Sequence, residues 1–392
     1  GIVCFFENHL NVAQRKVAEF SKCCGVEVSE TERSFDPYHE DPEGNATMTR
    51  MMRAAVFEDF GGPEVIEIKQ VPMPDPGPGE VRIKVEAAAM NHLDLWVRRG
   101  LPIQTPMPHI GGSDIAGVVD MVGTGADDVP LGTRVVVDPS LDYDWYEAQD
   151  QGSAFNENPF RIIGEHTQGG FAEYAVVPAS NILEIPESFG SAEAAAAGLV
   201  FVTAWRALTT RGRLKLGESV LITGASGGVG TAAVQIARSA GAKVFAVTGG
   251  TENVGRTQAL GADVVYDRFE VDFSREVWGD TNKCGVDVVL DTVGEEIWPH
   301  CLRALSRGGR LVTAGATTGS RGVTDVRLVF WKQLEILGST MGTSAEFRKV
   351  MRLVFRGVFD PVIQEVMPLK ETRRAHEILE KGNVFGKLVL VP

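Results

Sequence analysis

The residues best suited to chemistry form a glycine-rich turn between an apolar strand and a helical segment. The stretch VLITGASGGVG, residues 220–230, opens with an apolar run, and the Ala-rich pattern TAAVQIARS follows it. Only glycine lets a backbone approach a diphosphate closely, and the N-terminus of the following helix offers free N–H donors and a positive dipole end. The turn therefore predicts a dinucleotide-binding site.

The spacing of small residues within the turn is close to a dinucleotide fingerprint. The pattern GxGxxG asks for small residues where this chain has Ala225, Gly227 and Gly230, so alanine replaces the first glycine. A second strand, KVFAV at 243–247, completes a βαβ unit of about 30 residues. A glycine-rich turn in some other α/β protein is the alternative interpretation. The candidate diphosphate site comprises Ala225, Ser226, Gly227, Gly228, Val229 and Gly230.

The end of the second strand bears on the choice of coenzyme. An NAD-specific site places Asp or Glu there, about 20 residues after the glycine turn, to bind the ribose hydroxyls. This chain has Thr248 and Gly249 at that point, and Arg256 is the nearest cation. Because no carboxylate would repel a 2′-phosphate and Arg256 would attract one, we predict NADPH as the cofactor.

Composition is that of an ordinary globular protein and disfavours several classes of function. The chain has 392 residues, 44% of them hydrophobic, and a net charge of −14. This acidic balance disfavours nucleic acid and anionic membranes, which need clustered Lys and Arg. No apolar run reaches the ~18 residues of a membrane span, and the five cysteines show no CxxC spacing. We predict a cytoplasmic protein with free thiols that acts on a small-molecule substrate.

The elements around the turn fall into regions of different pattern. Residues 1–50 neither alternate nor cap cleanly, and we predict an extension that is disordered. From residue 53, alternating strands separated by Pro and Gly indicate a β-rich region. Beyond the glycine turn, strands spaced by helices predict a doubly wound parallel sheet. The last strand, GKLVLVP at 386–392, is expected to return to the β-rich region.

This order of parts resembles the medium-chain dehydrogenase/reductase superfamily over about residues 52–392. The resemblance is carried by NHLDLWVRRG from Asn91, GGSDIAGVV from Gly111, GEHTQGGFAEYAVVP from Gly164 and GASGGVG from Gly224. The glycine turn is similar to that of quinone oxidoreductases and enone reductases, whereas the Asn91 stretch is similar to zinc-type alcohol dehydrogenases. The resemblance implies an α/β fold in which a Rossmann doubly wound parallel sheet and a GroES-like β-rich domain flank a nicotinamide site.

The resemblance also sets the expected domains and assembly. We predict an N-terminal extension at 1–50, a GroES-like catalytic domain at 51–200 plus 340–392, and a Rossmann domain at 201–339. Since members of the superfamily usually form dimers or tetramers, we expect a homodimer or homotetramer.

The positions at which zinc relatives bind their metal carry other residues in this chain. Asn91 stands at a Cys position, Ser113 and Asp114 stand at a His-Glu pair, and Leu199 falls near the third ligand position. Because two thiolates and an imidazole are missing, the sequence predicts no metal site. The loop at 138–152 has no cysteine either, so no structural zinc is expected. A makeshift site is the alternative, from His92, Asp94, His109 and Asp114.

Further cofactor residues are carried over from the resemblance one by one. Thr203 matches a threonine beside the nicotinamide, and ordinary strand-to-loop chemistry is the alternative for the segments that line the cofactor. These segments are Thr292, Val293 and Gly294, and Ala314, Gly315 and Ala316. His92 and Lys387 match cations that approach the diphosphate, with solvated surface charge as the competing interpretation.

The missing metal directs the choice of reaction. Zinc stabilises charge concentrated on one oxygen, whereas in an enone or quinone the charge spreads through a conjugated system. We therefore predict NADPH-dependent hydride transfer to a quinone or an α,β-unsaturated carbonyl. Asn91 is the candidate catalytic donor, with bonding inside its turn as the rival role, and Asp94 is expected to brace that loop rather than donate a proton. Two alternatives stay open: an alcohol dehydrogenase with unrecognised metal ligands, and a non-catalytic NADPH-binding sensor.

Overall fold

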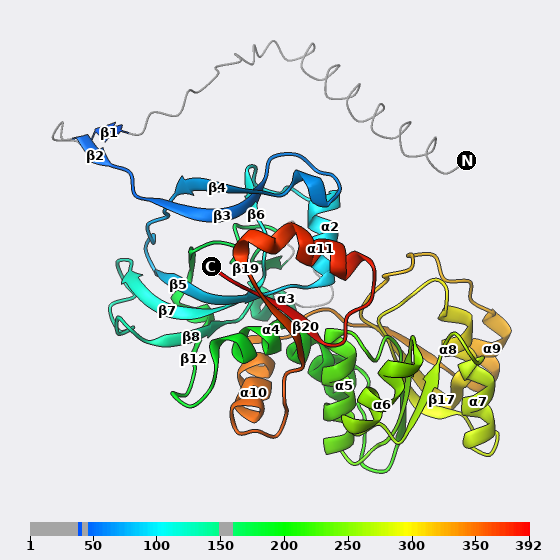
Figure 1. Cartoon of the computed structure of the whole chain (residues 1–392). Coiled ribbons are helices and arrows are strands. Elements are labelled where there is room, and N and C mark those ends of the chain that lie inside the picture. The colour runs from blue at the N-terminus through cyan, green and yellow to red at the C-terminus, as the bar shows by residue number, and fades with distance from the viewer. Residues whose placement is uncertain (1–37, 41–45, 149–159) are drawn as a thin grey trace, which may run out of the picture. The chain divides into compact units, whose positions relative to one another are not determined.

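The computed structural model describes residues 38–40, 46–148 and 160–392 (Figure 1). The chain divides into two units, Gly1–Thr49 and Arg50–Pro392. The disorder predicted for 1–50 lies outside the described residues at 1–37 and 41–45. Within the described positions of the first unit, β1 (Tyr38–Glu40) pairs antiparallel with β2 (Ala46–Met48). Every candidate site residue belongs to the second unit.

Antiparallel strands build the first part of the larger unit, as the alternation predicts. The strands are β3 (Met51–Phe57), β4 (Glu67–Pro72), β5 (Glu80–Ala89), β6 (His109–Ile110), β7 (Asp114–Val122), β8 (Arg134–Val137), β9 (Ser140–Leu141), β10 (Arg161–Ile162), β11 (Tyr174–Pro178), β12 (Ile182–Glu184), β19 (Ile363–Pro368) and β20 (Lys387–Val391). A seven-stranded sheet has the order β12-β8-β7-β5-β20-β19, with β11 also on β5, and a smaller sheet has the order β4-β3-β6. Because β20 pairs with β5, the last strand returns to the β-rich part as expected.

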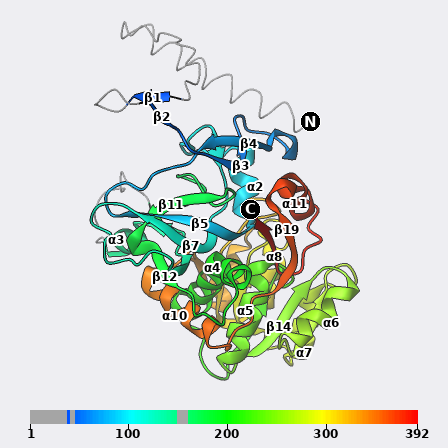
Figure 2. The same ribbon diagram turned by 60° about the vertical axis from the view of Figure 1, so that its left-hand side comes forward.

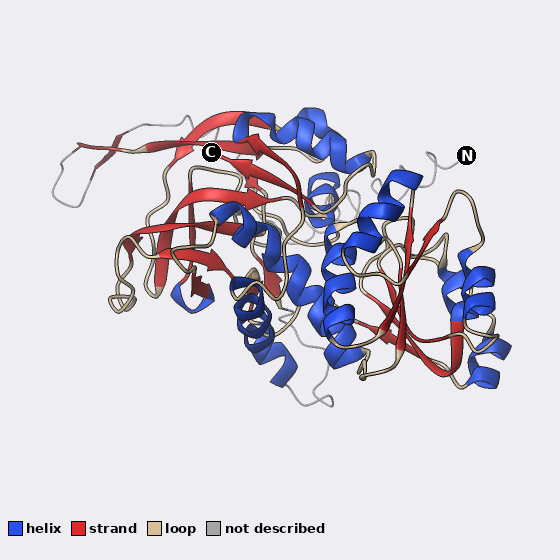
Figure 3. Cartoon of the chain, turned by 60° about the horizontal axis from the view of Figure 1, so that its bottom comes forward, coloured by secondary structure: helices blue, strands red, loops and turns tan. Residues whose placement is uncertain are grey.

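A six-stranded parallel sheet forms the second part. Its strands are β13 (Ser219–Ile222), β14 (Lys243–Thr248), β15 (Val264–Asp267), β16 (Val286–Asp291), β17 (Leu305–Thr313) and β18 (Glu335–Gly338). The order is β15-β14-β13-β16-β17-β18, so the direction of winding reverses between β13 and β16. Its helices are α5 (Gly228–Ser239), α6 (Thr251–Ala259), α7 (Phe273–Asp280), α8 (Trp298–Ala304) and α9 (Val326–Lys332). They lie on both sides of the strands (Figure 3), which confirms the doubly wound α/β fold.

A buried helix joins the two sheets. Helix α4 (Ser191–Trp205) is apolar around its whole circumference, and residues 194–204 are all buried. A helix without a polar face must be covered on every side, and α4 contacts β5, β7, α5 and α10 (Ser344–Phe355). It lies between the antiparallel sheet and α5 (Figures 1 and 2). The polypeptide continues from α4 into a π-helix at Arg206–Arg211.

A buried charge holds α11 (Thr372–Glu380) on α2 (His92–Arg99). The side chain of Arg98 is fully buried; its Nε donates to Gly61 O at 3.1 Å, and its guanidinium pairs with Glu380. Another guanidinium nitrogen of Arg98 lies 3.2 Å from His376 Nδ1. Burial and the charge of Arg98 lower the pKa of His376 to about 3. His376 is therefore a neutral acceptor in the folded protein.

Acid should weaken the fold through His376. The unfolded chain takes up a proton on this histidine near pH 6.5, whereas the folded chain does so only near pH 3, so the unfolding free energy should fall as pH drops below about 6.5. His376→Gln should remove about 2 kcal/mol of the loss between pH 7 and pH 5, measured by urea unfolding at both pH values. Equal losses in the variant and the wild type would contradict this assignment.

Candidate functional site

The glycine turn folds as predicted between β13 and α5. Gly224 takes a left-handed backbone with φ of 58°, and Gly227 precedes α5 without a side-chain cap in the described chain. A Cβ on Gly230 would lie 2.3 Å from Gly224 O, so only glycine permits this packing of helix on strand. A Cβ on Gly227 would approach no described atom closer than 3.4 Å. The turn thus leaves room for a ligand at the N–H donors that begin α5.

Two neighbouring loops meet the turn at the carboxyl ends of the strands. The buried carboxylate of Asp291, at the end of β16, accepts the N–H of Val293 at 3.0 Å and the hydroxyl of Thr223 at 2.9 Å. A Cβ on Gly224 would lie 2.8 Å from Thr292 Oγ1, and a Cβ on Gly315 would lie 2.7 Å from Thr292 O. The structure therefore brings together the predicted segments 224–230, 292–294 and 314–316, at the edge where doubly wound sheets bind ligands.

Asp291 is a site residue that the sequence interpretation missed. It also accepts the N–H of Gly294 at 3.2 Å, so one carboxylate shapes the whole loop after β16. Burial raises the pKa of Asp291. An acidic residue that ends a run of buried apolar residues is the sequence signal that could have identified it.

Two predicted threonines bury hydroxyls that have no hydrogen-bond partner among the described residues. Thr203 on α4 is 5% exposed, and Thr248 at the end of β14 is 2% exposed. Val200, one turn before Thr203, lies 2.9 Å from where a Cβ on Gly228 would be, so α4 adjoins the glycine turn. An unsatisfied buried hydroxyl is unfavourable. These two hydroxyls are therefore suited to line the binding site of a polar ligand such as a nicotinamide dinucleotide.

Two arginines lie near the end of β14. Arg256, predicted from the sequence, stacks on Phe385 with its guanidinium carbon 3.9 Å from the ring centroid. Arg268, which the sequence interpretation missed, has Nε 3.2 Å from where a Cβ on Gly249 would be, and its N–H donates to Thr248 O at 2.9 Å. It directly follows β15, the strand beside β14, so its position depends on strand order.

A buried ion pair stands where the resemblance places zinc ligands. Asp114 is fully buried, and its carboxylate accepts hydrogen bonds from Lys387 Nζ at 3.0 Å and Asn91 Nδ2 at 2.9 Å. It also accepts the N–H of Leu199 at 2.6 Å. Lys387 Nζ donates to Asn91 Oδ1 at 2.5 Å. This set, the Lys387 cluster, contains an ammonium and no thiolate or imidazole, so it does not fit a zinc ion.

These contacts bear on three of the predicted residues. The side chain of Asn91 is bonded to Asp114 and Lys387, so its amide oxygen and one amide hydrogen are engaged. The carboxylate of Asp94 accepts the N–H of Asn91 at 2.7 Å and of Gly112 at 3.1 Å, so it braces the start of α2. Burial raises the pKa of Asp94 to about 7. The ammonium of Lys387 faces Asp114 rather than the turn, although its stem lies 2.8 Å from where a Cβ on Gly228 would be.

The makeshift metal site does not assemble. His92 is exposed at the start of α2, and His109 is buried with Nε2 3.0 Å from Gly164 O. Asp94 and Asp114 are engaged with the partners given above. No group of three or more His, Cys, Asp or Glu within 38–40, 46–148 and 160–392 is placed to hold a metal ion.

Known proteins share this architecture. Residues 77–187 match the family model described as the alcohol dehydrogenase GroES-like domain, and residues 228–356 match that described as zinc-binding dehydrogenase. The chain is 31% identical to human quinone oxidoreductase, over 88% of this chain and 99% of that protein. The chain belongs to the medium-chain dehydrogenase/reductase superfamily. It falls in the quinone oxidoreductase and enone reductase branch, as the motifs predict, and is an NAD(P)H-dependent oxidoreductase.

Solved structures of the superfamily agree with the fold. An NAD-dependent alcohol dehydrogenase superposes with a TM-score of 0.80 at 39% identity, over 87% of this chain and all of that one. A 2-octenoyl-CoA carboxylase reductase, solved with NADP and 2-octenoyl-CoA, superposes with a TM-score of 0.79 at 27% identity, over 88% of each chain. In the described part of this chain, no helix is both long and apolar enough to cross a membrane.

Removing the charge of Lys387 alone should destabilise the protein more than removing the charges of Lys387 and Asp114 at the same time. Lys387→Met leaves the Asp114 carboxylate buried and unpaired, which should lower the unfolding free energy by about 3–5 kcal/mol. Adding Asp114→Asn should restore at least half of that loss, and Lys370→Met, at an exposed lysine, is the control. Urea unfolding of the wild type, Lys387→Met, Asp114→Asn, the double variant and the control measures this, and additive losses in the double variant would show that the pair is not coupled.

Proposed function

We propose that this protein transfers hydride from NADPH to a quinone or an α,β-unsaturated carbonyl without a catalytic zinc. The Lys387 cluster carries the proposal, because an ammonium and a carboxylate occupy the positions of the metal ligands. Reactions of simple alcohols and carbonyls place charge on one oxygen, which a metal would stabilise. A conjugated acceptor spreads that charge, so hydrogen-bond donors and water suffice.

The chain's own groups supply binding and orientation. When bound, the reduced nicotinamide supplies the hydride. The N-terminus of α5 and the residues 225–230 would hold the diphosphate, and the unpartnered hydroxyl of Thr203 would orient the nicotinamide end. The amide of Asn91 gives one hydrogen to Asp114, so its second hydrogen is the candidate donor to a substrate oxygen.

The relatives support a conjugated acceptor. Human quinone oxidoreductase is named for a quinone, and the solved 2-octenoyl-CoA carboxylase reductase is bound to an unsaturated thioester. The runner-up is an alcohol dehydrogenase, which the 39% identity to an NAD-dependent enzyme of that name favours. The contacts at Asn91 and Asp114 argue against it, since Lys387 Nζ donates to an oxygen of each side chain and the N–H of Leu199 donates to the other Asp114 oxygen.

NADPH is the proposed coenzyme. Thr248 and Gly249 follow β14, so no carboxylate stands at the ribose position of an NAD site. The carboxylate of Asp267, which pairs with Thr248 across β14 and β15, accepts the N–H of Gly250 at 3.1 Å and of Phe269 at 3.0 Å. Arg256 and Arg268 are both exposed and provide cations for a 2′-phosphate.

A homo-oligomer and a cytoplasmic location stay predictions. The surface suited to self-association lies beside β18, an edge strand of the parallel sheet in the described chain. Phe330 and Trp331 of the neighbouring α9 are 64% and 80% exposed, and such apolar patches next to a free sheet edge favour pairing. Sedimentation equilibrium of wild type and Trp331→Glu would test this surface.

The reaction can be tested with a panel of acceptors. Purified protein should oxidise NADPH in the presence of a quinone, an enone or an enoyl thioester, and dialysis against a chelator should leave the rate unchanged. Ethanol and other primary alcohols should give little or no turnover with NADP, because nothing replaces the metal as Lewis acid. Alcohol oxidation that is lost when a stoichiometric zinc is removed would favour the runner-up. NADPH binding without any turnover would favour a sensor.

Coenzyme choice depends on the two arginines. Arg268→Gln and Arg256→Gln should each weaken NADPH binding about tenfold and leave NADH binding unchanged, since each removes one charged contact to the 2′-phosphate. Fluorescence titration measures both affinities, with Arg275→Gln on exposed α7 as the matched control. Thr248→Asp should shift preference toward NADH. Equal affinities of the wild type for NADPH and NADH would contradict the proposed preference for NADPH.

A further inference from the structure

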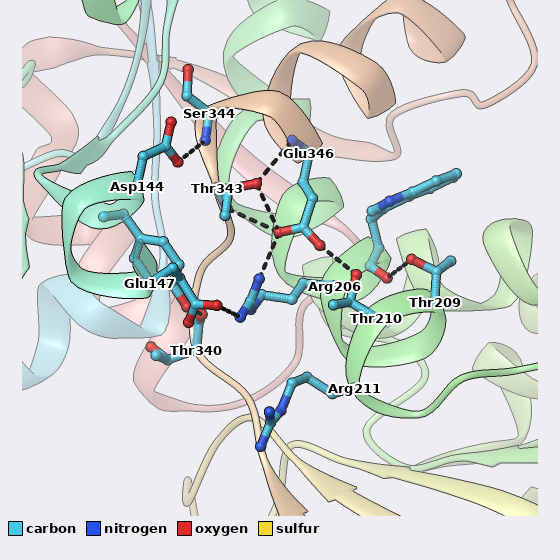
Figure 4. Close-up of polar contacts among 12 residues, drawn as sticks. Asp144, Glu147, Arg206, Thr209, Thr210, Arg211, Thr340, Thr343, Ser344 and Glu346 are labelled. Atoms are coloured by element: carbon cyan, nitrogen blue, oxygen red, sulfur yellow. Dashed lines mark hydrogen bonds and ion pairs between the residues drawn. The ribbon is translucent and has the colours of Figure 1, made fainter. Parts of the chain in front are cut away.

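A buried arginine at the end of α4 connects three elements away from the glycine turn. Arg206 is 4% exposed and begins the π-helix that follows α4. Its guanidinium lies 2.8 Å from Glu346 Oε2 on α10 and 2.7 Å from Glu147 Oε2 on α3 (Tyr143–Ala148), as Figure 4 shows. It also lies 5.3 Å from the ring centroid of Tyr143. A buried guanidinium paired on two sides fixes its partners, because losing either partner is costly.

The partners of Arg206 hold the loop at 339–343, which follows β18. The hydroxyl of Tyr143 donates to Thr340 O at 2.8 Å. The carboxylate of Glu346 accepts the N–H of Thr343 at 2.9 Å, and Asp144 Oδ1 accepts the N–H of Ser344 at 2.9 Å (Figure 4). The loop is therefore attached at Thr340 and Thr343, and Ser344, the first residue of α10, is attached to α3.

The π-helix contributes to the same attachment. It places Thr210 so that its hydroxyl donates to the second oxygen of Glu346, beside the contact from Arg206 (Figure 4). A π-turn is rare and is frequently found at functional sites. The end of α4 and the start of α10 are thus joined through one carboxylate.

The loop at 339–343 lies against the candidate nicotinamide residues. The N–H of Ser339 donates to Thr313 O at 2.9 Å, directly before the segment 314–316. A Cβ on Gly342 would lie 2.5 Å from Val202 Cγ2, the residue before Thr203. The hydroxyls of Ser339 and Thr203 are both buried without a partner in the described chain. The loop and the end of α4 therefore border the same end of the parallel sheet.

We propose that Arg206 is a positioning residue for the nicotinamide end of the coenzyme. By holding α3, α10 and the end of α4 together, it fixes the loop at 339–343 relative to Thr203. This role rests on the proposed function for the position of the coenzyme. It does not depend on which substrate accepts the hydride. The adenosine end has its own candidates at 225–230, Arg256 and Arg268, none of which contacts Arg206 in the described structure.

The test compares two ligands that share the adenosine end. NADPH carries the nicotinamide, whereas adenosine 2′,5′-bisphosphate lacks it, and calorimetry on the full chain gives both affinities. Arg206→Lys keeps the charge but cannot donate to both carboxylates in a fork. We expect NADPH affinity to fall about tenfold while bisphosphate affinity is unchanged, because only the nicotinamide wall shifts. Arg213→Lys, in the exposed pair with Glu335, should change neither affinity.

A second variant keeps the test decisive if Arg206→Lys does not fold. Glu147 is 38% exposed, and Glu147→Gln keeps its shape while Glu346 still neutralises the guanidinium. It should also lower the ratio of NADPH affinity to bisphosphate affinity, by a smaller factor than Arg206→Lys. Equal weakening of both ligands, or a lower melting temperature with an unchanged ratio, would overturn the proposal and leave Arg206 a purely structural role. A fallen ratio without turnover on any acceptor would support the positioning role and refute only the proposed function.

Discussion

The buried pair between Lys387 and Asp114 is the interaction on which the site depends. A charge in the interior is tolerated only when it is paired and hydrogen-bonded, so Asp114 on β7 collects partners from three other places: Asn91 at the start of α2, Leu199 on α4 and Lys387 on β20. Meeting that requirement brings the last strand of the chain and the buried helix α4 to one point. The glycine turn packs against both, since Gly228 adjoins Val200 and Lys387.

The residues just before Lys387 extend this connection along the coenzyme site. The N–H of Gly386 donates to Ser226 O at 2.8 Å, and Phe385 supports the guanidinium of Arg256. One short segment, residues 385–387, therefore contacts the glycine turn and Arg256 and supplies the ammonium of the Lys387 cluster.

An ion pair between Lys387 and Asp114 differs from a zinc ion in what it can stabilise. A zinc ion would leave an open position for a substrate oxygen, whereas the ammonium of Lys387 already donates to Asn91 and Asp114. The positive charge of the site is thus balanced within the protein before any substrate enters. Under the proposed function, this balance suits an acceptor that disperses its own charge.

The sequence by itself determined the parts of this protein that depend on local pattern. The glycine turn, the parallel and antiparallel regions and the missing acid at Thr248 are all readable because turns, strand periodicity and strand ends have short-range signatures. Tertiary structure alone decided the hydrogen-bond partners of Asn91, the placement of Arg268 beside Gly249 and the contacts of Arg206. Those depend on partners far along the chain, such as Asp114 and Lys387, which lie 273 residues apart, and burial of a charge selects such partners only once the sheets have packed.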